Sequence, residues 1–557
     1  MAYIQISYQM KKQFVLVLQL ITCGLFSQAP VTAKQPLALD KPKLIVAIVV
    51  DQMRYDYIYK YWEKLGTSGF KRLLGEGFNC KNTQYNYMPT FTGPGHASIY
   101  TGTTPSIHGI IANQWYSKER RKMVYCSEDT MVKNVGGSAR EGRMSPKNML
   151  STTFGDELRL FSNFGSRVFG IALKDRGAIL PAGHTGNAAY WFDPNTGHWM
   201  SSTHYMQTLP AWVAEFNKKD LVKSYLAKEW NTLLPIEKYT ESLSDNNPYE
   251  IPFQNETTPT FPHKLPELVA KGAGPGLIRS TPYGSNFTKD FAIDLIKNEK
   301  LGKGAFTDVI AISFSSPDLI GHQFGPQSIE VEDCYLRLDK DIEDLLKFLD
   351  TWLGKNNVLL FLTADHAAVD VPSYLSDKKI PSGYYTEDAI HDSLRKFCIR
   401  HFGDTLVSNV SNYQVFLNEK KLAITKIDRM MVQNKIAAYL LTLPGISESV
   451  PAHIFALAAF NEKPRSIMQA GYYAKRSGDV LFNYSPGWIE HDKRGTTHGS
   501  PYSYDTRVPL IWYGWGIKKG SSSELVNIID IAPTISVMLN TNFPNGCTGK
   551  PINFTGK

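Results

Sequence analysis

A threonine in a glycine-rich turn is the first group in this sequence that could do chemistry. Thr92 is followed by Gly93-Pro94-Gly95, and the residues from His96 to Tyr100 can begin a helix. A hydroxyl at such a turn can point out of a sheet edge beside helix N–H groups, which bind anions. Glycines also let a ligand approach the backbone closely. An isolated threonine here would more simply be a helix N-cap, so its role depends on the rest of the chain.

Three aspartates each follow an apolar run, and two of them have histidine neighbours. Asp318 is followed four residues later by His322, and Asp365 directly by His366; Asp51 is the third aspartate. The preceding runs, Leu44–Val50, Val309–Phe314 and Val358–Leu362, are typical of strands buried on both faces. Because ligands bind at the carboxyl ends of parallel strands, we expect these side chains to meet. Carboxylates and imidazoles suit Zn²⁺, and they also suit Mn²⁺ or Fe.

A two-metal site would give Thr92 a reaction to perform. His498, in the segment Thr-Thr-His-Gly, could complete one of the two sites. Two ions ~4 Å apart can activate a nucleophile and stabilise the leaving oxygen of a phosphate ester, so that a threonine alkoxide attacks phosphorus. The transferring oxygens need donors as charge spreads over them. Asn113, Lys174 and Arg176 are available, the arginine as a bidentate partner and the lysine as a point charge.

The elements that must position these residues predict an α/β fold. Val168–Leu173 is a further inner strand, which leads into the Lys-Asp-Arg segment. Residues 59–74 are expected to form one helix, and residues 328–352 a long amphipathic helix with Ser328 as its N-cap. Strands that alternate with helices favour a mostly parallel sheet covered on both faces. The alternation is lost at about 185–300 and 370–490, where we expect two insertions, the first an elaborated cap over the sheet.

The composition indicates a globular protein without a nucleic-acid partner. The 557 residues are 43% hydrophobic and 20% charged, which is ordinary for a folded domain. The net charge of +8 is spread along the chain without a long Lys/Arg run, so it helps to attract anionic substrates rather than nucleic acid. The five cysteines after residue 33 form no C-x-x-C pair, which argues against a cysteine zinc site.

The N-terminal residues are typical of an export signal. Lys11-Lys12 precedes an apolar run from Phe14 to Phe26, and Val31-Thr-Ala33 offers small residues for cleavage. We therefore expect a signal peptide at residues 1–33 and a periplasmic or secreted mature chain at residues 34–557. No later stretch is long and apolar enough to span a bilayer, so no stable membrane insertion is expected.

Seven segments together resemble the alkaline phosphatase superfamily, most closely the bacterial periplasmic alkaline phosphatases of the PafA type. The segments are Val50–Arg54, Pro89–Ser98, Pro105–Asn113, Leu173–Arg176, Pro317–His322, Ala364–His366 and Gly495–His498. Each segment is only modestly specific, but their number and order make the resemblance strong, and it runs from about residue 43 to the C-terminus. One departure is Ala367, where related enzymes often have glycine.

The resemblance implies a fold, an activity and a set of site residues. The fold would be a three-layer α/β/α sandwich with a mostly parallel central sheet and large cap insertions. The activity would be that of a monomeric, zinc-dependent alkaline phosphatase, which hydrolyses small-molecule phosphate monoesters through a phosphoprotein intermediate. The resemblance implies that one Zn²⁺ is bound by Asp318, His322 and His498. It implies that the other is bound by Asp51, Asp365, His366 and the nucleophile Thr92. It also implies that the phosphoryl oxygens are held by Asn113, Lys174 and Arg176.

Three alternatives make different predictions. A phosphodiesterase or nucleotide pyrophosphatase of the same superfamily would share both metal sites and Thr92, but it would not need Lys174 and Arg176 to stabilise a third charged oxygen. A sulfatase would need Cys or Ser in a C/S-x-P-x-R motif, where this chain has Thr92-Gly-Pro-Gly. An inactive exported binding protein of this fold would have lost ligands, whereas every expected ligand is present.

Overall fold

The computed structural model describes residues 41–491 and 493–554. The predicted signal peptide at residues 1–33 lies outside this range. Among the described helices, none combines the length and the apolar composition needed to cross a membrane.

An eleven-stranded sheet forms the centre of the fold. Its middle is parallel and runs in the order β10 (Val358–Thr363), β1 (Leu44–Val50), β9 (Asp308–Phe314), β6 (Val168–Ala172) and β7 (Ala188–Asp193). The edges add β18 (Leu510–Gly514), β2 (Phe78–Gln84), β17 (Arg507–Val508) and β19 (Gly520–Asn527) on one side, and β8 (His198–Ser202) and β5 (Asn134–Val135) on the other. Most edge pairs are antiparallel. The predicted α/β class is confirmed, with the parallel pairing confined to the buried middle.

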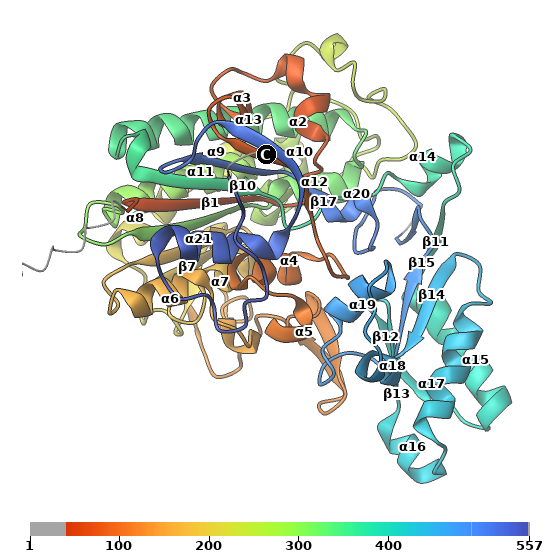
Figure 1. The fold of residues 1–557 in the computed structure, drawn as a ribbon. Helices are drawn as coiled ribbons and strands as arrows, with labels where there is room; N and C mark the ends of the chain where they lie inside the picture. Colours follow the sequence, from red (N-terminus) through yellow and green to blue (C-terminus); the bar gives the residue numbers. More distant parts are fainter. Residues whose placement is uncertain (1–40, 492, 555–557) are drawn as a thin grey trace, which may run out of the picture. The chain divides into compact units, whose positions relative to one another are not determined.

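Helices cover both faces of this sheet (Figure 1). On one face lie α11 (Tyr283–Asn298) and α13 (Ile329–Trp352), and on the other α4 (Thr92–Thr101), α6 (Phe154–Phe161), α7 (Asp175–Ala182) and α21 (Ile531–Leu539). The predicted N-cap of the long helix is confirmed, because Ser328 Oγ accepts a hydrogen bond from the Val331 N–H at 3.1 Å. Buried strands and two helical layers together enclose one large apolar core.

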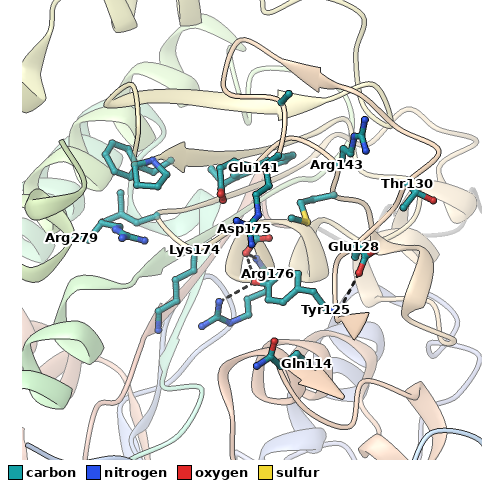
Figure 2. A pocket seen from close by; sticks show the side chains of 17 residues that line it. Gln114, Tyr125, Glu128, Thr130, Glu141, Arg143, Lys174, Asp175, Arg176 and Arg279 are labelled. Atoms are coloured by element: carbon teal, nitrogen blue, oxygen red, sulfur yellow. Dashed lines mark hydrogen bonds between the residues drawn. The ribbon is translucent and has the colours of Figure 1, made fainter. Parts of the chain in front are cut away.

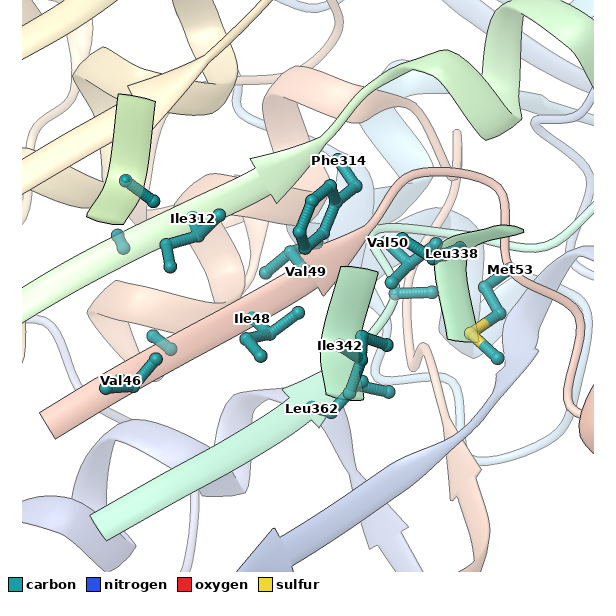
Figure 3. Packing of buried hydrophobic residues seen from close by; sticks show 14 of the residues in the cluster. Val46, Ile48, Val49, Val50, Met53, Ile312, Phe314, Leu338, Ile342 and Leu362 are labelled. Carbon is teal, nitrogen blue, oxygen red and sulfur yellow. The ribbon is translucent and has the colours of Figure 1, made fainter. Parts of the chain in front are cut away.

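The register of the three central strands brings their ends together. Val49 of β1 lies opposite Ser313 of β9 and Thr363 of β10. All seven residues of β1 are fully buried, which explains its continuous apolar sequence. Figure 3 shows Val49 and Val50 beside Phe314, with side chains of α13 packed against them. Residues that follow β1, β9 and β10 therefore emerge at one edge of the sheet.

The single helix predicted at residues 59–74 is wrong. The chain forms α2 (Tyr57–Lys60), a 3-10 turn (Trp62–Lys64) and α3 (Phe70–Glu76) in its place. The cause is a tertiary contact: Asp339 of α13 accepts hydrogen bonds from the backbone N–H groups of Gly66 and Phe70, both at 2.7 Å. A Cβ at Gly69 would lie 2.2 Å from the Asp339 carboxylate. The break therefore depends on a partner that is far away in the sequence.

A second, smaller sheet lies in the C-terminal half. It is antiparallel, in the order β12 (Val407–Ser411), β13 (Gln414–Leu417), β15 (Val480–Tyr484) and β14 (Ile446–Pro451). With α15 (Glu387–Phe402) and α17 (Arg429–Leu440) it encloses an apolar cluster of its own. The predicted insertion boundaries, at about 185–300 and 370–490, stay predictions.

The buried middle of β1 should dominate stability. We expect Ile48→Ala to lower the free energy of unfolding by about 2–5 kcal/mol, because a fully buried isoleucine leaves a cavity. The control is Ile424→Ala on α16 (Glu419–Thr425), where the side chain is 70% exposed and the cost should stay below about 0.5 kcal/mol. Calorimetric melting of both variants measures the difference; equal losses would contradict this view of the core.

Candidate active site

Three buried carboxylates meet at the end of the central strands. Asp51 follows β1, Asp318 lies in the first turn of α12 (Ser316–Phe324) after β9, and Asp365 follows β10. Their exposures are 0%, 3% and 0%. Gln52 links two of them, since its backbone N–H donates to Asp365 Oδ1 at 3.0 Å and its side-chain amide donates to Asp318 Oδ1 at 2.9 Å. The strand register thus produces an acidic cluster, as the sequence predicted.

Lys174 is the cation in contact with this cluster. It is the N-cap residue of α7 and lies two residues after the end of β6. Its Nζ lies 2.6 Å from Asp318 Oδ2 and 3.0 Å from Asp51 Oδ2. Burial opposes the ionisation of Asp318, but the charges of His322 and Lys174 outweigh it and hold its pKa well below its usual range. Burial lowers the pKa of Lys174, but the charges of Asp318 and Asp51 outweigh it and raise that pKa. Asp318 and Lys174 are therefore both held in their charged forms.

Two histidines point their Nε2 atoms at Asp318. His322 Nε2 lies 3.3 Å and His498 Nε2 3.7 Å from Asp318 Oδ1. On the other side of each ring, Nδ1 faces a backbone carbonyl. His322 Nδ1 lies 2.7 Å from the Thr496 carbonyl oxygen, and His498 Nδ1 lies 2.6 Å from the Thr90 carbonyl oxygen. A carbonyl only accepts, so each Nδ1 carries a proton, and Nε2 is the ring atom left to bind a metal. The three ligand atoms lie within 4.8 Å of one another.

A second group of ligands surrounds Asp365. His366 Nε2 lies 3.3 Å from Asp365 Oδ2, and both atoms are buried without a hydrogen-bond partner in the described chain. The His366 ring stacks on His498 with 3.4 Å between centroids. Asp51 and Asp365 also share a 4.8 Å cluster with His96. All the predicted ligands are thus brought together, and His366 lies between the two groups.

His96 and Tyr125 are site residues that the sequence reasoning missed. His96 is fully buried one turn after Thr92, and its Nε2 lies 3.4 Å from Asp51 Oδ1. The four-residue spacing within a helical turn could have indicated it. Tyr125 lies in the short strand β4 (Lys122–Tyr125), which carries no motif. Its hydroxyl accepts from Arg176 Nη1 at 3.0 Å and donates to Asp175 Oδ1 at 2.5 Å.

Thr92 stands at the start of α4, with both predicted phosphate-binding cations beside it. Lys174 Nζ and Arg176 Nη2 each lie 3.5 Å from Thr92 Oγ1. The Asn113 side-chain oxygen Oδ1 accepts from the Gly93 N–H at 2.7 Å, which leaves the side-chain NH₂ as a donor. A Cβ at Gly95 would lie 2.4 Å from the Asp365 carbonyl oxygen, so only glycine lets this helix approach the acidic cluster.

The sequence matches one protein-family model over most of its length. The model for type I phosphodiesterase / nucleotide pyrophosphatase matches residues 45–505. The chain belongs to this family.

Named relatives agree with the predicted resemblance to alkaline phosphatases. The chain is 44% identical to alkaline phosphatase PhoV of Synechococcus elongatus, with 93% of each chain covered. It is 42% identical to alkaline phosphatase PafA of Elizabethkingia meningoseptica, with 93% and 95% covered, and a crystal structure of PafA matches it with a TM-score of 0.89 over 92% of this chain and 99% of that one. A Myroides odoratus protein named calcium-transporting ATPase is 45% identical, with 95% and 97% covered. The resemblance to the PafA type and the fold class are both confirmed.

The residues of this family member fit divalent cations. Oxygen and imidazole donors converge from five segments, and the buried atoms Asp365 Oδ2 and His366 Nε2 form no hydrogen bond with any described residue. A buried polar atom without a partner is costly, so a cation would stabilise the site. The donor set of carboxylates and histidines suits zinc.

Zinc binding should therefore stabilise the folded chain. At a free Zn²⁺ concentration one hundred times its Kd, a ligand that binds only the folded state adds about 2.7 kcal/mol, so Tm should rise on addition of zinc and fall with a chelator. Asp318→Asn should reduce this rise, because that carboxylate contacts both histidines of its cluster. Asp392→Asn on the exposed face of α15 is the control. A Tm that does not respond to zinc would contradict the metal site.

Proposed function

We propose that this protein is a zinc-dependent alkaline phosphatase, which hydrolyses small phosphate monoesters through a phospho-threonine intermediate at Thr92. The chain is a phosphoric monoester hydrolase by its relation to the alkaline phosphatases PafA and PhoV, each more than 40% identical over nearly its whole length. The observation that carries the finer proposal is the convergence of Lys174 and Arg176 on the Thr92 hydroxyl, at 3.5 Å each, beside the acidic cluster.

The two metal ions would have distinct ligands. Asp318, His322 and His498 would hold one zinc ion, and Asp51, Asp365, His366 and Thr92 the other. When bound, such a pair lowers the pKa of the nucleophile's hydroxyl and neutralises charge on the leaving oxygen.

Thr92 is positioned to attack phosphorus. Its hydroxyl lies at the N-terminal end of a ten-residue helix, where backbone N–H groups favour a phosphoryl group. Attack forms a bond between Thr92 Oγ1 and phosphorus while the bond from phosphorus to the alcohol oxygen breaks. The phospho-threonine is then hydrolysed by water, which regenerates the hydroxyl and releases inorganic phosphate.

Three donors would bind the phosphoryl oxygens. Arg176 is fixed by the Tyr125 hydroxyl, so its planar group can present two N–H donors without losing much side-chain freedom. Lys174 adds a point charge, and the free amide of Asn113 adds a neutral donor. Such preorganised donors stabilise the charge that develops in phosphoryl transfer.

A phosphodiesterase is the second candidate, because the matching family model carries that name. A diester presents one charged oxygen fewer than a monoester dianion. Two cations beside the nucleophile therefore favour the monoester, since a diester would leave part of their charge unmatched.

The setting of the reaction is also part of the proposal. The basic and apolar N-terminal residues are typical of export, so the enzyme would act in the periplasm or outside the cell after loss of residues 1–33. We expect it to act as a monomer on small molecules.

Removing the nucleophile should abolish turnover but not metal binding. We expect Thr92→Ala to lower kcat for an aryl phosphate by at least about 10³-fold, because the covalent step is lost, while bound zinc stays near the wild-type level. Thr101→Ala is the control, since Thr101 lies in the same helix and bonds only to the Ala97 carbonyl in the described chain. Near-normal phosphatase activity of Thr92→Ala would sink the mechanism.

The two cations should discriminate monoesters from diesters. We expect Lys174→Ala and Arg176→Ala to lower kcat/KM for an aryl phosphate monoester much more than for the matching methyl diester, because only the monoester has the extra charged oxygen. Lys122→Ala, an exposed residue of β4, should change neither value. Equal losses on both substrates would mean that these residues act only in the structure of the site.

A further inference from the structure

A cavity of about 690 Å³ adjoins the residues that would bind the phosphoryl group. The segment from Leu173 to Arg176 forms part of its wall, and the rest comes from Gln114, residues 125–144, residues 191–194 and Arg279. Cavities of ~300–1,000 Å³ typically hold small-molecule ligands. A phosphoryl group occupies only a small part of such a volume. The remaining space is available to the leaving group, the alcohol part of the substrate.

The wall carries arginines that have no carboxylate partner. Arg279 lies in a 3-10 turn (Pro275–Ser280) and is partly buried. Its Nε donates to the Gly276 carbonyl at 3.3 Å, and no ion pair within the described chain includes it. Arg140 and Arg143, both exposed, likewise form no ion pair there. A partly buried guanidinium without a carboxylate is costly unless it binds an anion.

Basic residues outnumber acidic ones in the cavity wall. Burial lowers the pKa of Arg279, and the charge of Arg176 adds to this effect, while the charge of Glu141 opposes it; the two guanidinium groups therefore repel each other. Figure 2 shows Arg279 beside Lys174, with Arg143 and Glu128 on the far side. Ligands with negative charge would relieve the repulsion between these cations.

The acidic residues of the wall do not cancel this charge. The Asp175 carboxylate accepts from the Tyr125 hydroxyl and from the backbone N–H of Arg176. The Glu128 carboxylate accepts from the backbone N–H of Tyr125 at 3.4 Å. Glu141 is the remaining acid. Burial and the charge of Asp175 raise the pKa of Glu141, which weakens it as a partner for the arginines.

The aromatic side chains of the wall offer a leaving group little surface to bind. Trp191 and Phe192 are the aromatic residues of the wall, apart from Tyr125, but they are only 1% and 2% exposed. They support the wall from inside the core and offer little surface to a ligand. Aromatic stacking on the leaving group is therefore disfavoured, and the charged side chains of the wall are the groups that can bind it with directed contacts.

We propose that this cavity binds a leaving group that carries a second anionic group, a carboxylate or a phosphate, and that Arg279 is the residue that recognises it. This inference rests on the proposed monoester hydrolysis. The substrate class is phosphate monoesters whose alcohol part carries a carboxylate or a second phosphate. Arg140 and Arg143, the exposed arginines of the wall, add to the attraction. Glu141, beside Arg140 and Arg279, opposes it.

The test compares two substrates with the same carbon skeleton, 3-phosphoglycerate and glycerol 3-phosphate, on the zinc-loaded full-length enzyme. The quantity measured is the ratio of kcat/KM for 3-phosphoglycerate, whose alcohol part carries a carboxylate, to kcat/KM for glycerol 3-phosphate, whose alcohol part is uncharged. We expect Arg279→Gln to lower this ratio about tenfold relative to the wild type. Glu141→Gln should raise it, and Arg279→Lys should restore part of it because the charge is kept.

The outcomes separate this inference from the proposed function. The control is Arg395→Gln, which removes an exposed arginine from α15 and should leave the ratio unchanged. Wild-type turnover of glycerol 3-phosphate, with an Arg279→Gln ratio equal to that of the wild type, would overturn the second-anion site and leave the phosphatase standing. Equal losses on both substrates in Arg279→Gln would also overturn it, because Arg279 would then support the reacting centre alone. No hydrolysis of either monoester by the wild type would overturn both proposals.

Discussion

Three carboxylates buried at the ends of neighbouring strands repel one another, and the rest of the site depends on how this repulsion is met. Asp51, Asp318 and Asp365 are nearly inaccessible to water, so solvent screens them little. Buried like charges ordinarily take up protons. Here the chain supplies Lys174 as a counter-charge and directs the Nε2 atoms of His322 and His498 at Asp318. The arrangement is unfavourable by itself and becomes favourable with cations, which is the property expected of a metal centre.

The parallel sheet is what makes this concentration of charge possible. The pairing of β1 with β9 and β10 sets the register, and the buried apolar side chains of β1 hold the three strands together. Around this edge, α4 presents Thr92, and Lys174 is the N-cap residue of α7. Groups on rigid elements are placed more accurately than groups on loops. The candidate site thus adjoins the most deeply buried strands, while the cavity wall comes largely from connecting segments, which tolerate sequence change more readily.

The sequence predicts which residues come together at this edge of the sheet, because local patterns mark them. Asp51 and Asp365 follow recognisable buried strands, and the Asp318–His322 spacing places both residues on one side of a helical turn. The helix N-cap Ser328 is also a local signal. These features need no knowledge of distant partners, and the resemblance to a family rests on the same short segments.

What the sequence reasoning missed depends on contacts between distant segments. The break between α2 and α3 is caused by Asp339, about 270 positions away in the chain. Tyr125 belongs to the site only because its strand lies beside Arg176, and no pattern around it marks it as functional. Arg279 is likewise an ordinary arginine in the sequence, and only the folded chain places it on the same cavity wall as Lys174.

The most direct test of the account is anomalous X-ray diffraction from crystals of the zinc-loaded enzyme, measured at the zinc absorption edge. A two-metal centre predicts two peaks, ~4 Å apart as in other two-metal sites. One peak should lie among Asp318, His322 and His498, and the other among Asp51, Asp365 and His366 next to Thr92. A single peak, or none at this edge of the sheet, would contradict the claim that the buried carboxylates form a two-metal centre.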